Sequence, residues 1–372
     1  MKNVLVVGAG QLGLMMACSA ARLGVSVDRI DHVTGEILPG TSQKRLPAAG
    51  DDFSTQYDVI TAELEHLLGN PLVEKLQERP NWLNPTAMDR LPARDSQKTL
   101  LDDIGVATSP WRRINGLNDL ESAFETVGED LVVKTIRDGY DGKGQWVVSA
   151  GHPAEFSDEA FGRIIAEKKI AFDREVSIVG ARFSDGECYC LPLAENFHDE
   201  GMLRYTIAPA VCDKPLEHQA RQMFEAVTRE LGYTGVLAIE CFDVDGQLIV
   251  NEIAPRVHNS GHWSQSGSTV SQFDLHLLSI TGLSCPPPSV TRPTLMLNLI
   301  GCEWNPDWCE LPDIQMWWYG KSYRENRKLG HINISADSPH QLIQIAGNLQ
   351  SSFDTLHQQM LTRALNRLTE IQ

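Results

Sequence analysis

Two acidic residues in the middle of the chain have the types and spacing of a metal site. Glu240 and Glu252 each lie in an apolar, strand-like run, and Asp245-Gly246 between them is a turn signal. This pattern predicts a β-hairpin that is at least half buried. A three-residue loop would place Glu240 directly opposite Glu252, whereas a two-residue loop would place it opposite Asn251. The first arrangement is the one that brings two carboxylates together.

Like charges that face each other destabilise a sheet. The sequence nevertheless keeps Glu240 and Glu252 among apolar residues, which favours a divalent cation between them. Two carboxylates and the amide oxygen of Asn251 suit Mg²⁺ that also binds substrate phosphates. The alternative interpretation is a solvated hairpin face that carries two acids.

A second motif is a glycine-rich loop that follows a strand-like run ending at Lys134. Gly139, Gly142 and Gly144 lie close together in this loop. Their N–H groups can wrap phosphates, and Lys134 supplies a point charge for the same anions. The loop is not a Walker A motif, because no Gly-Lys-Ser/Thr opens a helix. An exposed hairpin tip is the alternative.

The N-terminus carries a third motif, Gly8-x-Gly10-x-x-Gly13, after a short apolar run. Such a turn offers N–H groups and a helix N-terminus to an anion. Dinucleotide binding, ribose-phosphate binding and a simple tight turn all use it. Asp28 or Asp31 lies near the position of a ribose-binding acid, so an NAD-dependent oxidoreductase stays open as an alternative.

Composition limits the function classes. The chain has 372 residues, of which 42% are hydrophobic and 22% charged, as in a soluble globular protein of two or three domains. The net charge of −17 argues against nucleic acid or an anionic membrane as the main partner. The eight cysteines are scattered and are expected to be reduced thiols. With no signal-peptide pattern and no membrane-length apolar run, we expect a cytoplasmic protein.

Hydrophobic periodicity and glycine or proline punctuation predict the elements that must position these motifs. The N-terminus reads as a βαβ unit, and a Pro- and Arg-rich boundary near 85–92 follows it. A final unit begins after Cys285-Pro286-Pro287-Pro288 and contains the basic run 324–331, which by itself could be a solvated face. The predicted strands are 4–7, 25–28, 58–61, 131–134 and 295–300, and the predicted helices are 14–23, 95–104, 216–231 and a C-terminal one through Leu361, Leu365 and Leu368.

The order of these motifs resembles the ATP-grasp ligases. Three runs narrow the resemblance to the N5-carboxyaminoimidazole ribonucleotide synthases: Gly139 to Gln145, Asn251 to His262, and Arg327 to His331. The chain departs from the family pattern at Asp138, where a glycine is usual, and at Glu325-Asn326, where Pro-Gly is usual.

The resemblance implies an α/β (α+β) chain with the ATP-grasp fold. It implies an N-terminal Rossmann-like domain over 1–94, a central ATP-grasp domain over 95–291 and a small C-terminal domain over 292–372. A mobile lid would occupy about 115–180 of the central domain.

The resemblance also implies roles for individual residues. Mg²⁺ would be bound by Glu240 and Glu252. ATP would be bound by Lys98, Lys134, Gly139, Gly142, Gly144, Glu167 at the adenine hinge, Glu175 at the ribose, and Asn251. The ribotide substrate would be bound by Gln11, Leu12, Glu63, Tyr140, Asp141, Lys143, Arg327 and Lys328. Catalysis on bicarbonate and carboxyphosphate would involve Arg256, His258, Asn259 and Lys328.

The activity implied is ATP-dependent carboxylation of 5-aminoimidazole ribonucleotide (AIR) with bicarbonate, through carboxyphosphate, in purine synthesis. The family further implies a homodimer that passes its product to N5-carboxyaminoimidazole ribonucleotide mutase, with no nucleic-acid or membrane partner. Another ATP-grasp ligase, such as the formate-dependent glycinamide ribonucleotide transformylase or a biotin carboxylase, is the alternative within the superfamily.

Overall fold

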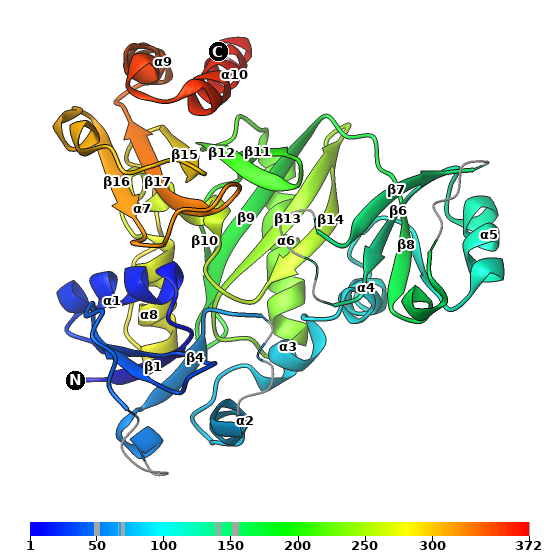
Figure 1. Ribbon diagram of the computed structural model, residues 1–372, viewed down its shortest axis with the longest axis horizontal. Helices are drawn as coiled ribbons and strands as arrows, with labels where there is room; N and C mark the ends of the chain where they lie inside the picture. Colours follow the sequence, from blue (N-terminus) through cyan, green and yellow to red (C-terminus); the bar gives the residue numbers. More distant parts are fainter. Residues whose placement is uncertain are drawn as a thin grey trace.

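The computed structural model describes residues 1–47, 53–65, 67, 71–137, 139, 143–150 and 156–371. Three β-sheets organise these residues, with the largest sheet at the centre of the molecule and the N-terminal unit, the β5–β8 unit and the C-terminal helices around it (Figure 1). None of the helices in this part of the chain is both long and apolar enough to cross a membrane.

The N-terminal sheet has the order β3-β2-β1-β4, in which β2, β1 and β4 are parallel and β3 is an antiparallel edge. The helix α1 follows the glycine turn and ends at Gly24, whose φ of 67° is left-handed and whose N–H donates to Ala20. The predicted βαβ start is confirmed. The bounds are β1 Asn3–Val7, α1 Gln11–Leu23, β2 Ser26–Ile30, β3 Ile37–Pro39, η1 Phe53–Gln56, β4 Val59–Ala62, α2 Pro71–Gln77 and α3 Pro85–Arg90.

The central sheet has nine strands in the order β14-β13-β9-β11-β12-β15-β17-β16, with β10 paired to β9. Helix α6 covers one face of this sheet, and Leu237 and Ile239 of β13 pack in the same core cluster as α6. Helix α8 covers the opposite face, and Ala238 packs in the same core cluster as α8. Since Glu240 is two residues beyond Ala238, it lies on the α8 face. The bounds are β9 Arg174–Arg182, β10 Cys188–Cys190, β11 Ala194–Asp199, β12 Met202–Ala208, α6 Lys214–Glu230, β13 Gly235–Val244, β14 Gln247–Ala254, η3 Asn259–Gly261, α7 Ser264–Gly267 and α8 Gln272–Thr281.

A small four-stranded sheet, β5-β8-β6-β7, projects beside the central one at the right of Figure 1. It occupies most of the segment expected to form a lid. Helix α4 carries Lys98, and α5 covers the sheet through the buried side chains of Leu120 and Ala123. The bounds are α4 Arg94–Asp103, β5 Trp111–Ile114, α5 Leu117–Thr126, β6 Asp130–Thr135, β7 Gln145–Ser149, η2 Asp158–Ala160 and β8 Ile164–Lys168.

The last unit extends the central sheet, because β15 pairs with β12 and continues to β17 and β16. The predicted division near residue 292 therefore falls in a loop, yet the sheet runs across it. Helices α9 and α10 pack on one face of this extension, at the top of Figure 1. The bounds are β15 Thr294–Ile300, η4 Pro306–Glu310, β16 Ile314–Trp318, β17 Lys328–Ser335, α9 Pro339–Leu349, η5 Gln350–Ser352 and α10 Thr355–Glu370.

Candidate active site

Glu240 on β13 and Glu252 on β14 are paired directly across the ladder. The turn that joins the two strands has only two residues, Asp245 with φ of 49° and Gly246 with φ of 76°. Positive φ at both positions is typical of a tight hairpin turn that matches the strand twist. The prediction that this pairing requires a three-residue loop is therefore wrong, although the pairing of Glu240 with Glu252 is present.

A β-bulge explains the pairing. Cys241 pairs with Val250 and Glu240 pairs with Glu252, so Asn251 is one extra residue on β14. A bulge redirects side chains next to a functional site. Here it makes consecutive residues available to one site: the oxygen of Asn251 accepts from Lys134 at 3.2 Å, and Glu252 lies 3.8 Å from Arg94.

Burial and neighbouring carboxylates raise the cost of ionising Glu240 and Glu252. Burial raises the pKa of Glu240, and the charge of Glu175 raises it further against the opposing effect of His198. Burial also raises the pKa of Glu252, with Arg94 opposing the shift and Glu240 adding to it. A bound cation would remove this repulsion, which is the property expected of a metal site.

Glu167 on β8, which the resemblance assigns to the adenine hinge, lies between two lysines. Its Oε2 is 3.1 Å from Nζ of Lys98 and 3.3 Å from Nζ of Lys134, and it accepts from Ser109 at 2.8 Å. Burial would raise the pKa of this carboxyl, but Lys134 and Lys98 outweigh burial and lower it to about 2. Glu167 is thus charged and positions Lys134, while its other oxygen, Oε1, makes no hydrogen bond within the described structure.

Lys98 is enclosed by protein. Its Nζ donates to Thr108 at 2.7 Å and to Ser109 at 2.9 Å, in addition to the ion pair with Glu167. The residue is only 2% exposed, and an ammonium has three donors. The role in ATP binding that the resemblance implies for Lys98 therefore conflicts with its position, since the donors of its ammonium group are already used inside the protein.

Arg94 joins the site although the sequence analysis missed it. It donates to the carbonyl oxygens of Thr135 at 3.0 Å and Gly139 at 3.1 Å, so it connects the glycine loop to the side of Glu252. Arg94 is four residues before Lys98 on α4, and residues at that spacing share one helix face. The four-residue spacing from Lys98 was thus the sequence signal that could have identified Arg94.

His198 on β11 is the second residue that the sequence analysis missed. Its Nδ1 is 2.5 Å from Glu175, and its Nε2 is 3.8 Å from Glu240. Burial opposes protonation, but Glu175 and Glu240 raise the pKa of His198. A lone histidine in a strand gives no signal in the sequence, because only strand pairing brings it beside Glu175.

Gln272 of α8, which is fully buried, fixes the segment after β14 by hydrogen bonds to its backbone. Gln272 accepts from the backbone N–H of His258 at 2.8 Å and donates to its carbonyl at 2.7 Å. Nε2 of His258 lies 3.7 Å from Glu240. Burial and the neighbouring charges of Arg256, Lys328 and His198 hold the pKa of His258 well below 6.5, so its ring is neutral. Neither polar atom of the Asn259 side chain has a hydrogen-bond partner in the described structure.

The N-terminal glycine turn binds an anion, but the anion is a side chain of this protein. The carboxylate of Glu63 accepts from the N–H of Gly10 and from that of Gly13, the latter at 2.7 Å. A Cβ on Gly8, whose φ is +127°, would lie 2.2 Å from Cγ of Glu63. The N–H groups of Gly10 and Gly13, which were expected to face an anion, therefore bind Glu63 in the structure described. Leu12 is buried, so it can contribute to a ligand only through its backbone.

The contacts of Asp28 and Asp31 weaken the interpretation of the glycine turn as a dinucleotide site. Asp28 accepts from the hydroxyl of Tyr57 at 2.7 Å and from the N–H of Gly40 at 3.2 Å. Asp31 forms an ion pair with Arg45 at 2.6 Å. Both candidate ribose-binding acids thus have partners within the N-terminal unit.

The basic run of the last unit reaches the site through Lys328, whose charge acts on Glu240, His198 and His258. Arg327 instead donates to Ser322 in its own loop, at 3.0 Å to the carbonyl and 2.8 Å to the hydroxyl. Asn326 has φ of 59°, the left-handed conformation that a glycine adopts easily.

Several predicted lid residues cannot be placed. Tyr140, Asp141 and Gly142, as well as Asp138, lie outside the described residues. Gly144, with φ of +70°, accepts from the N–H of Thr135 at 2.8 Å.

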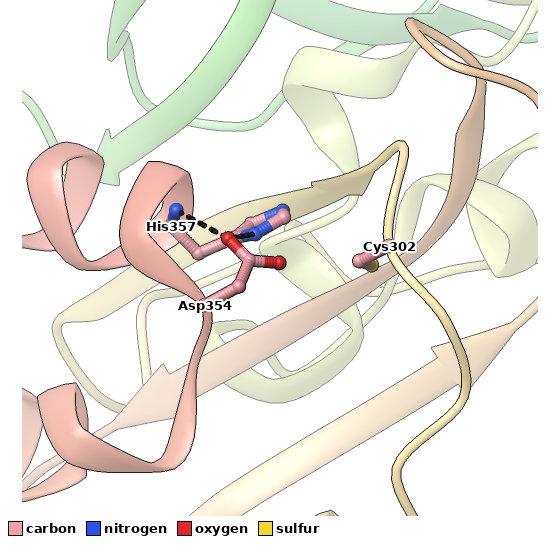
Figure 2. Close-up of side chains that lie close together, drawn as sticks. All are labelled: Cys302, Asp354 and His357. Carbon is pink, nitrogen blue, oxygen red and sulfur yellow. Dashed lines mark hydrogen bonds and ion pairs between the residues drawn. The ribbon is translucent and has the colours of Figure 1, made fainter.

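Away from this site, Cys302, Asp354 and His357 lie close enough together for a metal (Figure 2). Nδ1 of His357 is 2.8 Å from Asp354, and its Nε2 accepts from the backbone N–H of Ile300 at 3.1 Å. Both ring nitrogens are thus used, and burial raises the pKa of Cys302 to about 12. The histidine fastens α10 to the end of β15.

The chain matches the family model of the ATP-grasp domain over residues 99–273 and that of the phosphoribosylaminoimidazole carboxylase C-terminal domain over residues 294–345. The fold is thus that of the ATP-grasp class.

Similar proteins show to which family within the ATP-grasp class the chain belongs. The N5-carboxyaminoimidazole ribonucleotide synthase of Haemophilus influenzae is 39% identical over 369 residues, which cover 98% of each chain. The crystal structure of the corresponding synthetase from Thermus thermophilus has a TM-score of 0.82 at 32% identity and covers 94% of this chain and 98% of that one. The Staphylococcus aureus enzyme, in a structure with ADP, has a TM-score of 0.80 at 31% identity, over 92% and 95% of the chains. The chain belongs to the N5-carboxyaminoimidazole ribonucleotide synthase family.

Proposed function

We propose that this protein is an ATP-dependent ligase that carboxylates AIR with bicarbonate to N5-carboxyaminoimidazole ribonucleotide, releasing ADP and phosphate. The observation that carries the proposal is the opposition of Glu240 and Glu252 next to Lys134, Arg94 and Arg256. The near full-length similarity to synthases of this name supports the choice of substrate over that of other ATP-grasp ligases.

The residues present fit Mg²⁺. Glu240 and Glu252 supply hard oxygen donors. Burial raises the pKa of both carboxyls, the charge of Glu175 adds to the shift of Glu240, and the charge of Glu240 adds to the shift of Glu252. Asn251 supplies a neutral oxygen beside them. When bound there, Mg²⁺ would neutralise and orient phosphate oxygens.

ATP would lie between the small β5–β8 sheet and the central sheet. Lys134 and Arg94 come from the side of the small sheet and would bind phosphate oxygens. Glu175, in contact with His198, would face the ribose hydroxyls. Glu167 orients Lys134 and retains one oxygen, Oε1, for the adenine side, while Gly139, Gly142 and Gly144 would allow the loop to close over the phosphates.

Bicarbonate would bind at Arg256, since a guanidinium can hold two oxygens of one anion. One bicarbonate oxygen attacks the γ-phosphorus of ATP, which gives carboxyphosphate and ADP. The exocyclic amine of the ribotide then takes up the carboxyl group, from carboxyphosphate or from CO₂ released in place, and phosphate leaves. Neutral His258 and the amide of Asn259 would hydrogen-bond the anions without adding charge.

The ribotide would approach from the N-terminal unit. Gln11, the backbone of Leu12 and the carboxylate of Glu63 are proposed to bind its ribose end. Lys328 and Arg327 would bind its phosphate. Tyr140, Asp141 and Lys143 would cover the imidazole when the lid closes and excludes water from the acyl phosphate.

The family resemblance supports the remaining parts of the proposal. They are the domain division at 94/95 and 291/292, a homodimer, a cytoplasmic location and delivery of the product to the mutase.

One coupled assay tests the function. ADP release is measured with ATP and Mg²⁺, with and without bicarbonate and AIR, alongside ¹⁴C incorporation from labelled bicarbonate into the ribotide. We expect ribotide-dependent incorporation. Turnover that depends on formate with glycinamide ribonucleotide, or on biotin, would instead identify another ATP-grasp ligase.

A further inference from the structure

Arg256 is held by a carboxylate from the N-terminal part of the chain. Its Nη2 lies 2.5 Å from Oε1 of Glu65, and its Nη1 donates to the carbonyl oxygen of Val257 at 3.0 Å. The side chains of Glu65 and Arg256 are 13% and 22% exposed, so water and salt screen this pair only weakly. Glu65 follows β4 of the N-terminal sheet, whereas Arg256 follows β14 of the central sheet. The contact therefore joins two sheets at the site.

These two contacts, an ion pair and a hydrogen bond, restrain the orientation of the guanidinium. A guanidinium is planar and has five N–H donors in fixed directions. Contacts to both Nη atoms restrain the plane, and among the described residues the remaining donors, including Nε–H, have no hydrogen-bond acceptor and are left for another anion. Without Glu65, the carbonyl of its own neighbour, Val257, would be the one hydrogen-bond partner left to the Arg256 side chain among the described residues, and the side chain could rotate.

We propose that Glu65 is a positioning residue for the carboxylation reaction. It fixes the Arg256 guanidinium so that the remaining donors face the anion made from bicarbonate. This inference rests on the proposed function, in which Arg256 binds that anion.

The position of Glu65 adds a connection to the ribotide side. Two residues earlier, Glu63 binds the N–H groups of Gly10 and Gly13. The segment 63–65 thus contacts the glycine turn with one carboxylate and Arg256 with the next. The part of the protein proposed to receive the ribotide therefore also orients the residue that holds the carboxyl donor.

The test compares Glu65→Gln, which keeps the shape and removes the charge, with Glu65→Asp, which keeps the charge. Asp58→Asn is the matched control, because Asp58 forms an exposed ion pair with Lys2, at 3.3 Å, at the other end of β4. We expect Glu65→Gln to lower kcat/KM for bicarbonate by about tenfold or more, since a misplacement of the order of 1 Å can cost roughly 10²-fold. The KM for ATP stays within about twofold, Glu65→Asp recovers part of the loss, and Asp58→Asn behaves like wild type.

A double-mutant cycle shows whether Glu65 acts through Arg256. In the Arg256→Lys background, Glu65→Gln should cause little further loss. Equal losses in both backgrounds, or a loss confined to melting temperature, would overturn the inference.

A readout without turnover separates this inference from the proposed function. Phenylglyoxal modification of Arg256, followed by peptide mass spectrometry, should be several-fold faster in Glu65→Gln than in wild type, because the ion pair shields the guanidinium. If wild type does not carboxylate the ribotide, the proposed function fails, and this rate still decides whether Glu65 holds Arg256. An unchanged rate would contradict the positioning role.

Discussion

Glu240 faces Glu252 because one extra residue, Asn251, bulges out of β14 in a hairpin that has a two-residue turn. The bulge gives the site two carboxylates and an amide oxygen from adjacent strands. It also directs Asn251 toward Lys134, whose Nζ donates to Oδ1 of Asn251 at 3.2 Å. This hydrogen bond joins the proposed metal site to a lysine that is proposed to bind phosphate.

We predict that Glu240→Gln and Glu252→Gln each lose nearly all ATP turnover, by roughly 10²-fold or more, because each removes a proposed metal ligand. Folding should survive. In metal-free protein the melting temperature should stay the same or rise, since repulsion between like charges is removed. ADP release and thermal melting with and without Mg²⁺ measure both effects, and turnover within about tenfold of wild type in both variants would refute the metal assignment.

The two lysines around Glu167 should behave differently. Lys134→Met should raise the KM for ATP by an order of magnitude or more, because Lys134 is the more exposed of the two, at 12% against 3% for the Lys98 side chain. Lys98→Met should mainly lower stability, since it leaves the buried Glu167 with one cation fewer. Nucleotide affinity and urea unfolding separate the two outcomes. A Lys98→Met protein of normal stability that fails to bind ATP would show that Lys98 contacts the nucleotide directly.

Gly10→Val should impair ribotide binding through Glu63. A Cβ at Gly10 would lie 2.9 Å from Oε1 of Glu63, so the carboxylate must leave the turn. We expect the apparent KM for the ribotide to rise far more than that for ATP. Gly347→Ala is the control, because a Cβ there meets no atom within 4 Å. A variant impaired mainly in ATP binding would mean that the turn serves a different ligand.

Arg256→Lys should keep ATP affinity and lose about 10²-fold or more in ribotide carboxylation. Lysine offers a point charge, which cannot reproduce two parallel hydrogen bonds to one anion. Isothermal titration with ATP beside carboxylation kinetics tests this. Unchanged carboxylation, or lost nucleotide affinity, would each contradict the role of Arg256.

Buried neutral histidines should make the protein less stable as pH falls. Burial lowers the pKa of His331 to about 3 and that of His276 to about 4, from 6.5. Between these values and 6.5 the unfolded chain binds protons that the folded protein does not, so stability is complete above pH 6.5 and decreases below it. Each histidine contributes about 1 kcal/mol between about pH 7 and 5.5. Urea unfolding at both pH values should show a smaller decrease for His276→Gln, and an equal decrease would refute this assignment.

Local pattern was sufficient for much of this protein. Alternating or continuous apolar runs and glycine stops predicted β1, α1, β4, α4, β6, α6 and β15 close to their observed bounds, because each depends on neighbouring residues. The C-terminal helix predicted through Leu361, Leu365 and Leu368 is α10. The run from Asn251 to His262 likewise indicates the family by its sequence alone.

Tertiary structure decided what pairing between distant segments controls. The sequence could not show that a bulge would restore the opposition of Glu240 to Glu252, that Glu63 would fill the glycine turn, or that Glu65 would hold Arg256. Nor could it show that His198 lies beside Glu175. These contacts depend on strand register and on how separate sheets pack, which no local periodicity encodes. The types of residue in the site were therefore readable from the sequence, whereas their partners were set by the fold.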